Sequence, residues 1–161
     1  VDAEGRFAYV ADSNNHAVRV VDLQAFTVGT IAGSFEGVHG VQLGLPATFY
    51  FPSSVSLDPD GRRVYVSDQL NNQLRYINLD DCSGNHLKRQ CRVQHLAGHV
   101  RRPITSRFPH ALPQNGSRDG PARAAALSTP TYVHASRLDQ GVVVAFSERG
   151  NQKVRTVSLY A

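Results

Sequence analysis

The sequence has no methionine, only two cysteines among its 161 residues, and no long apolar run. Because no stretch reaches about 18 consecutive apolar residues, no segment is predicted to cross a membrane as a helix. The chain begins at Val1 instead of methionine, and no apolar signal-peptide core follows. We therefore expect a processed, truncated or excised piece of a longer polypeptide.

Catalytic signatures are also missing. The sequence contains no G-x-S-x-G, P-loop, H-E-x-x-H or C-x-x-C motif. Its seven histidines are scattered, and the regularly spaced pair, His95 and His99, starts in a predicted strand, where the two rings cannot share a helical face. We predict no catalytic residue, no metal site and no cofactor, and therefore a protein that is not an enzyme.

The positive signal is a pattern that occurs three times. In each copy a glycine is followed after seven residues by an acidic residue, after three more by asparagine, and after four more by arginine. The three sets are Asp12, Asn15 and Arg19; Asp68, Asn71 and Arg75; and Glu148, Asn151 and Arg155. Successive acidic positions are separated by 56 and then by 80 residues. Constant spacing within the copies and unequal spacing between them predict a repeated module with insertions in its loops.

Each copy predicts short β-strands. In the middle copy, the strand formers of 64–66 and 74–77 flank a polar turn, whose Asx side chains bond their own backbone. Two further strands are predicted, at 54–57 after a shared proline and at 93–96 before a shared Ala-Gly. Four antiparallel strands repeated about an axis form a propeller blade. The predicted fold class is therefore all-β, a propeller with about three blades.

At these residues the chain resembles the NHL-repeat family of β-propellers. The matching text includes YVADSNNHAVRVVDL, VYVSDQLNNQLRYINL and VVVAFSERGNQKVRTVSL. We expect one propeller region over residues 1–161, in which the first blade lacks its first strand and the last blade lacks its fourth. The predicted blade units are 1–33, 51–98 and 128–161, and the insertions are 34–50, 80–92 and 99–127. Because propellers have about four to eight blades, we expect closure by the remainder of a parent chain or by a homodimer.

The repeated acid–Asn–Arg set is interpreted as structural. Its Asx residues fix the turn, and the guanidinium of Arg19 and its counterparts can bond acidic or carbonyl groups of a neighbouring blade. A residue that recurs in every blade usually serves the blade, although a line of arginines facing a ligand is the alternative. Phe49 and Leu127 each lie three residues before the shared proline, so both are expected in the core.

The two cysteines, Cys82 and Cys91, flank a polar excursion between two predicted strands. A disulfide that pins this loop is the first interpretation, and it implies an oxidising compartment. A zinc site that also uses His86 and His95, or two unlinked thiols, are the alternatives. Asn115 begins an N-glycosylation sequon, which is usable only in a secreted chain.

The formal charge of +4 is concentrated in the insertion at 99–127, which holds five arginines against one acidic residue. A basic loop can meet phosphate, an acidic lipid or an acidic protein face, or can simply be solvated. The candidate binding residues are Arg101, Arg102, Arg107, Phe108, Arg118 and Arg123.

The resemblance to NHL propellers implies a binding or scaffold module that presents loops to a protein, peptide or glycan. The cysteine pair and the sequon favour an extracellular or lumenal version. The alternative is a cytoplasmic RNA-binding propeller, in which Phe108 stacks a base beside Arg107. A second alternative is an enzyme that resembles the peptidyl-hydroxyglycine amidating lyase, but none of the site residues of that lyase can be matched here.

Overall fold

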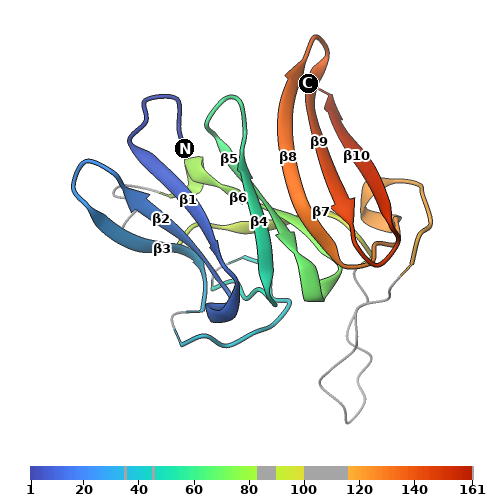
Figure 1. Cartoon of the computed structure of the whole chain (residues 1–161), viewed down its shortest axis with the longest axis horizontal. Coiled ribbons are helices and arrows are strands. Elements are labelled where there is room, and N and C mark those ends of the chain that lie inside the picture. The colour runs from blue at the N-terminus through green and yellow to red at the C-terminus, as the bar shows by residue number, and fades with distance from the viewer. Residues whose placement is uncertain (35, 45, 83–89, 100–115, 161) are drawn as a thin grey trace.

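The computed structural model describes residues 1–34, 36–44, 46–82, 90–99 and 116–160. The described residues form three antiparallel β-sheets that stand side by side (Figure 1). The first sheet has the order β1-β2-β3, the second β4-β5-β6-β7 and the third β10-β9-β8. This arrangement confirms an all-β partial propeller, in which the described residues provide no first strand for the first blade and no fourth strand for the last.

The first blade consists of β1 (Phe7–Asp12), β2 (Ala17–Asp22) and β3 (Thr27–Gly33). The second consists of β4 (Pro52–Leu57), β5 (Arg63–Asp68), β6 (Gln73–Asn78) and β7 (Val93–Ala97). The third consists of β8 (Pro130–Leu138), β9 (Gly141–Glu148) and β10 (Lys153–Tyr160). Short 3-10 helices lie at η1 (Ser13–Asn15), η2 (Gln69–Asn71), η3 (Leu79–Asp81) and η4 (Ala122–Ala124).

In the first two copies the polar turn of the repeat is a 3-10 turn followed by one left-handed residue, His16 or Asn72. In the second blade η2 ends at Asn71, and Asn72 adopts φ 52° before β6 begins. Asparagine tolerates this region better than most residues, because its side chain bonds locally. At the opposite end of the blade, Gly61 (φ 70°) closes the turn between β4 and β5 with a hydrogen bond to the Asp58 carbonyl, 2.8 Å long.

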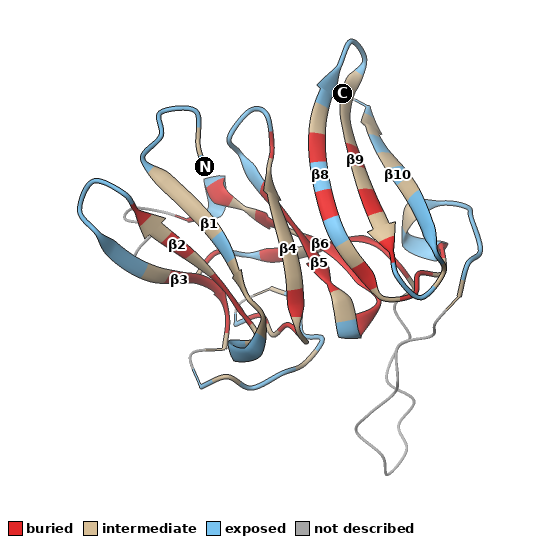
Figure 2. Cartoon of the chain, in the orientation of Figure 1, coloured by how far each residue is buried: buried red, intermediate tan, exposed pale blue. Residues whose placement is uncertain are grey.

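Apolar side chains fill the two spaces between neighbouring blades. The buried stretches of the ribbon are red in Figure 2. The cluster between the first and second blades includes Val18, Val66 and Phe49, and the cluster between the second and third includes Leu74 and Leu127. Phe49 and Leu127 are fully buried, so the expectation that both belong to the core is confirmed. Each sheet alternates its apolar residues between the two faces, as strand geometry requires.

Some repeat positions that are buried in the second blade are exposed on the outer faces of the first and third blades. Val10 is 44% exposed, whereas its counterpart Val66, which faces the first blade, is completely buried. Val154 in the third blade is 76% exposed, whereas its counterpart Leu74 is completely buried. The difference arises because the second blade has a neighbouring blade on each of its two faces. The outer faces of the first and third blades are covered by none of the described residues.

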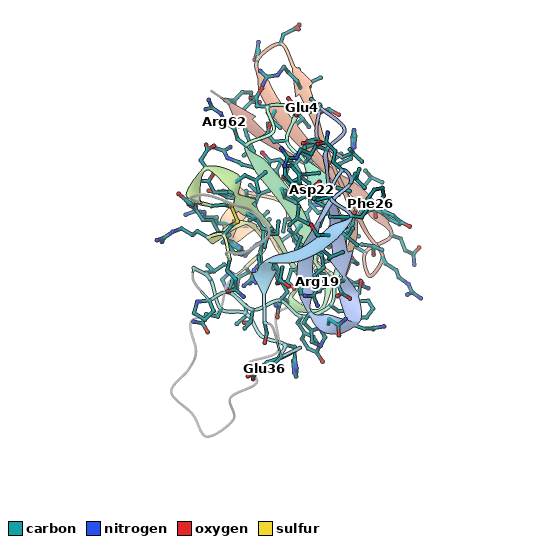
Figure 3. The ribbon with its side chains drawn as sticks, turned by 90° about the vertical axis from the view of Figure 1, so that its left-hand side faces the viewer. Glu4, Arg19, Asp22, Phe26, Glu36 and Arg62 are labelled. Atoms are coloured by element: carbon teal, nitrogen blue, oxygen red, sulfur yellow. A yellow bond between two sulfur atoms is a disulfide. The ribbon has the colours of Figure 1, made fainter. Side chains whose placement is uncertain are left out.

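Two long connectors join the blades: the first connector (34–51) follows β3, and the second connector (98–129) follows β7. Figure 1 shows the first connector on the lower side, with η1 and η2, and the β4–β5 and β8–β9 hairpins on the upper side. In Figure 3, Glu36 of the first connector lies at the lower end, while Glu4 and Arg62 lie toward the upper end. We call this lower end, which carries the first connector, η1 and η2, the connector face. Among the described residues, no helix has the length and apolarity needed to cross a membrane.

Candidate functional site: the connector face

The second blade shows how the repeated side chains are arranged. Asp68 ends β5, and the amide of Asn71 in η2 donates to its Oδ2 at 2.7 Å. The guanidinium of Arg75, on β6, lies 3.1 Å from the same oxygen. The side chains of Asp68 and Arg75 are completely buried, so each charge is compensated within the protein rather than by water.

The same three side chains hold the first connector. The backbone N–H of Tyr50 donates to Asp68 at 2.8 Å, and the Asn71 amide donates to the Gly40 carbonyl at 2.6 Å. Arg75 donates to the Thr48 carbonyl at 2.5 Å, so a connector without regular structure finds partners for its backbone. Burial raises the pKa of Asp68 to about 6, against the lowering effect of Arg75, Asn71 and the Tyr50 N–H.

The third blade repeats this geometry with a longer acid. Arg155 lies 2.9 Å from Glu148, and the Asn151 amide donates to the same carboxylate at 3.1 Å. The N–H of Ser128 donates to Glu148 at 2.7 Å. The Asn151 amide also reaches the Gly116 carbonyl, at 2.6 Å. The acid–Asn–Arg set therefore fixes the second connector as it fixes the first.

Arg155 extends this contact into the basic insertion. It donates to the carbonyls of Ala126 and Arg118, at 2.9 and 3.0 Å, and forms a 2.9 Å ion pair with the exposed Asp119. The repeated arginines were predicted to bond acidic or carbonyl groups of a neighbouring blade. That prediction was wrong in its partner, because Arg75 and Arg155 bind the acid of their own blade and the connector that enters it.

In the first blade the same set binds within its own sheet, where Arg19 also donates to the hydroxyl of Thr30 on β3. Asn15 donates to both carboxylate oxygens of Asp12 at 2.9 Å, and Arg19 lies 2.9 Å from Asp12. About a quarter of each charged side chain is exposed, 26% for Arg19 and 28% for Asp12. Slight burial raises the pKa of Asp12, but the hydrogen bonds from Asn15 and Arg19 outweigh it, so the pKa lies below its ordinary value. No connector among the described residues covers this set.

The residue after the repeated asparagine carries a second contact, between blades. The Oδ1 of Asn72 accepts from the N–H of Thr129 at 2.7 Å, just before β8. At the preceding junction, the Nδ1 of His16 accepts from the N–H of Phe51 at 3.1 Å, just before β4. Thr129 and Phe51 both have positive φ, 46° and 57°. Each junction thus has one side-chain acceptor that stabilises an unfavourable backbone conformation.

Three rings gather at the first junction. The ring of His39 lies 4.3 Å from that of Tyr50 and 5.5 Å from that of His16. Burial and the neighbouring His39 lower the pKa of His16, although a hydrogen bond with the Ser13 backbone opposes the shift. This cluster could not be predicted from the sequence, since His39 comes from the connector and no spacing rule relates it to His16.

Only part of the predicted basic site can be placed. Arg118 and Arg123 are exposed on the second connector, and Arg118 donates to the Ala124 carbonyl at 3.2 Å. Arg101, Arg102, Arg107, Phe108 and the sequon residue Asn115 lie outside the described residues. Whether the six binding candidates form one surface therefore stays a prediction.

A disulfide joins Cys82 and Cys91, which are nine residues apart in the chain. Both cysteines are buried and belong to the core cluster between the first two blades. The bond removes the thiolates that the zinc interpretation requires. Burial lowers the pKa of His95 to about 4, so this ring is neutral at pH 7. No group of three His, Cys, Asp or Glu suited to a metal ion is found among the described residues.

The comparisons with known proteins agree on the fold. No model of a known protein family matches the chain. Over 80 residues, or 49% of its length, the chain is 35% identical to NHL repeat-containing protein 2 of Gallus gallus. It spans only 11% of the length of that relative.

Solved structures cover more of the chain at lower identity. An auxiliary nutrient binding protein of Bacteroides thetaiotaomicron superimposes on 99% of this chain, and on 36% of its own, with a TM-score of 0.71 and 18% identity. A candidate phosphatase of the same organism covers 100% of this chain and 34% of its own length, with a TM-score of 0.67 and 20% identity. Such identities show the fold alone. The sequence similarity over half of the chain and the structure together confirm a resemblance to NHL-repeat proteins and a partial β-propeller fold, present in the described residues as three blades.

Proposed function

We propose that this propeller is a non-catalytic binding and scaffold module whose connector face engages a negatively charged protein, peptide or glycan. The observation that carries the proposal is the repeated anchoring of both connectors by buried acid–Asn–Arg sets at the same end of the blades. Rigid blades that hold long loops on one face are a common basis for recognition. Arg118 and Arg123, which are exposed on the second connector, add positive charge that such a partner would meet.

An extracellular or lumenal location is part of the proposal. The buried disulfide supports it, because such bonds persist mainly in oxidising compartments. A count of free thiols on protein isolated from its own cells, under non-reducing conditions, tests the location. We expect no free thiol, and two free thiols would contradict an oxidising compartment.

The binding partner can be tested by charge. We would measure binding to heparin, to an acidic peptide and to a single-stranded RNA of mixed sequence, each over a range of salt concentrations. The double variant Arg118→Glu, Arg123→Glu should weaken binding to the acidic glycan or peptide several-fold. Arg62→Glu is the matched control, since Arg62 is exposed at the opposite end (Figure 3), and it should leave binding unchanged.

Three outcomes would overturn the proposal. Equal losses in both variants would mean that overall charge, rather than the connector face, governs binding. RNA bound much more tightly than either acidic polymer, with affinity that falls steeply with salt, would favour the RNA-binding alternative instead. Hydrolysis of a phosphate ester that is lost on replacing a described residue would contradict the non-catalytic assignment.

A further inference from the structure

Three large apolar side chains are exposed on the connector face. Val41 and Leu43 belong to the first connector and are 50% and 40% exposed, and Leu70 of η2 is 37% exposed. They lie around one contact, because the amide of Asn71, which follows Leu70, donates to the carbonyl of Gly40, which precedes Val41. We call Val41, Leu43 and Leu70 the apolar patch. It lies at the junction of the first and second blades, away from the two outer faces of the array.

The backbone under the apolar patch is firmly held. The N–H of Gly40 donates to the Phe49 carbonyl at 2.8 Å, which closes the connector on itself. The buried guanidinium of Arg75 donates to the carbonyls of Val41 and Gln42. A backbone fixed in this way presents the side chains in one arrangement, so a partner that covers them loses little binding energy to the ordering of the loop.

The second junction has the same framework under different side chains. Arg155 donates to the carbonyl of Arg118 at 3.0 Å, as Arg75 donates to that of Gln42 at 3.4 Å. The flanking residues therefore correspond, and Val41 and Leu43 are matched by Ser117 and Asp119. These two counterparts are also exposed, but they are polar.

The counterpart of Leu70 has no side chain at all. The N–H of Leu70 donates to the Tyr50 carbonyl at 3.0 Å, and the N–H of Gly150 donates to the Ser128 carbonyl at 3.3 Å in the same way. The framework therefore forms without an apolar group at any of the three positions. Apolar side chains that gather on a surface without serving the fold are typical of a binding site.

Strand β7 links the apolar patch to the positive charge of the second connector. At its start, Val93 and Gly44, which adjoins the patch, exchange backbone hydrogen bonds of 3.0 and 3.3 Å. Past its end, the N–H of Gly98 donates to the carbonyl of Ala122 at 3.0 Å, immediately before Arg123. Five steps of about 3.3 Å place these two contacts about 17 Å apart. A partner that reaches both needs apolar and acidic groups separated by about this distance.

We propose that the apolar patch and the arginines of the second connector together bind an acidic peptide segment of a partner protein that also carries large apolar side chains. The apolar side chains of the segment pack on the apolar patch and remove it from water, and its carboxylates meet Arg118 and Arg123. This inference rests on the proposed function and narrows its partner to a peptide, because an acidic glycan has no large apolar side chain to cover the patch.

The test uses two labelled peptides of equal charge, LFLGSGSEEE and SSSGSGSEEE, whose linker spans about 17 Å when extended. We expect the unmodified chain to bind the first at least about tenfold more tightly, because only its side chains cover the apolar patch. The triple variant Val41→Ser, Leu43→Ser, Leu70→Ser should lose this preference and still bind SSSGSGSEEE and heparin as before, which also shows that it is folded.

The matched control is the double variant Leu23→Ser, Phe26→Ser, which removes exposed apolar side chains from the β2–β3 turn, at the opposite end of the first blade. This variant should keep the full preference for LFLGSGSEEE. Loss of the preference in the control as well as in the triple variant would contradict a specific role for the apolar patch.

The remaining outcomes separate this inference from the proposed function. Equal affinity of the unmodified chain for the two peptides, with both affinities lowered by Arg118→Glu, Arg123→Glu, would overturn the inference and leave the proposed function intact. A preference for LFLGSGSEEE that survives in the triple variant would overturn it too, because the apolar side chains would then bind elsewhere. If the arginine variant weakened binding of neither peptide nor heparin, the proposed function itself would be wrong.

Discussion

Arg75 and Arg19 occupy the same position of the repeat in different surroundings. The ion pair of Arg75 with Asp68 is completely buried and holds a connector, whereas that of Arg19 with Asp12 is partly exposed. Removing one partner of a buried pair leaves the other charge buried, with neither a counter-charge nor water to stabilise it. An exposed pair contributes little, because water solvates the charge that remains. The chain therefore contains the same acid–arginine ion pair twice, once buried and once partly exposed, and the two can be compared directly.

We predict that Arg75→Ala lowers the free energy of unfolding by about 3–5 kcal/mol, because Asp68 stays buried without its cation. The matched variant Arg19→Ala should cost about 1 kcal/mol or less. Equilibrium urea denaturation, followed by circular dichroism, measures both values. Similar losses in the two variants would show that burial of the acid–Asn–Arg set is not what stabilises the second blade.

His16 and Asn72 make the same inter-blade hydrogen bond, but only His16 titrates near neutral pH. The His16 Nδ1 must be unprotonated to accept from Phe51. Its pKa lies below the ordinary 6.5 in the folded state, mainly through burial and then through His39. The stability that it contributes is therefore fully present above pH 6.5 and is lost as the pH falls through 6.5 toward the folded pKa.

The variant His16→Asn should keep the hydrogen bond and lose this pH dependence, as the Asn72 junction illustrates. We expect the difference in urea midpoint between about pH 7.5 and about pH 5 to be smaller in the variant than in the unmodified chain. Subtracting the two profiles removes the background from other groups, such as Asp68. Identical profiles would mean that the His16 bond contributes nothing measurable.

The turn between β6 and β7 is an element held by a covalent bond. Cys82 and Cys91, which are nine residues apart in the chain, are joined by a disulfide and pack in the core beside Ile77 and Val93. Because a disulfide of this loop size restricts the unfolded chain, we predict that the double Cys82→Ser, Cys91→Ser variant is less stable by about 2–3 kcal/mol. Urea denaturation with and without reductant checks this. Reductant should affect the unmodified chain only, and insensitivity of both proteins would contradict the prediction.

The elements were largely predictable from the sequence because the repeat fixes them. The shared proline, the Asx turn and the terminal Ala-Gly mark strand limits by local backbone chemistry, which a sequence displays directly. The connector contacts were not predictable. The Asn71 bond to Gly40 and the approach of His39 to His16 depend on how irregular backbone folds back over 31 and 23 residues. No period relates such residues, and the inter-blade acceptor differs between junctions.

At the scale of the whole molecule, three blades share two apolar interfaces and leave two outer faces uncovered by described residues. The same repeat positions are buried in the middle and exposed outside, as Val66 and Val10 show. Closure of the ring by further blades of a parent chain or by a second copy stays a prediction. The stability of the array is expected to resemble a sum of blade and interface terms.

The central claim is that buried acid–Asn–Arg sets and the side chains after them tie each connector to the blades. Residue-resolved amide hydrogen exchange in the native chain tests this most directly. Four amides in irregular backbone, those of Tyr50, Phe51, Ser128 and Thr129, donate to Asp68, His16, Glu148 and Asn72. We predict that these amides exchange as slowly as the amides of neighbouring strands. Exchange of these four amides at the rates of an open loop would contradict it.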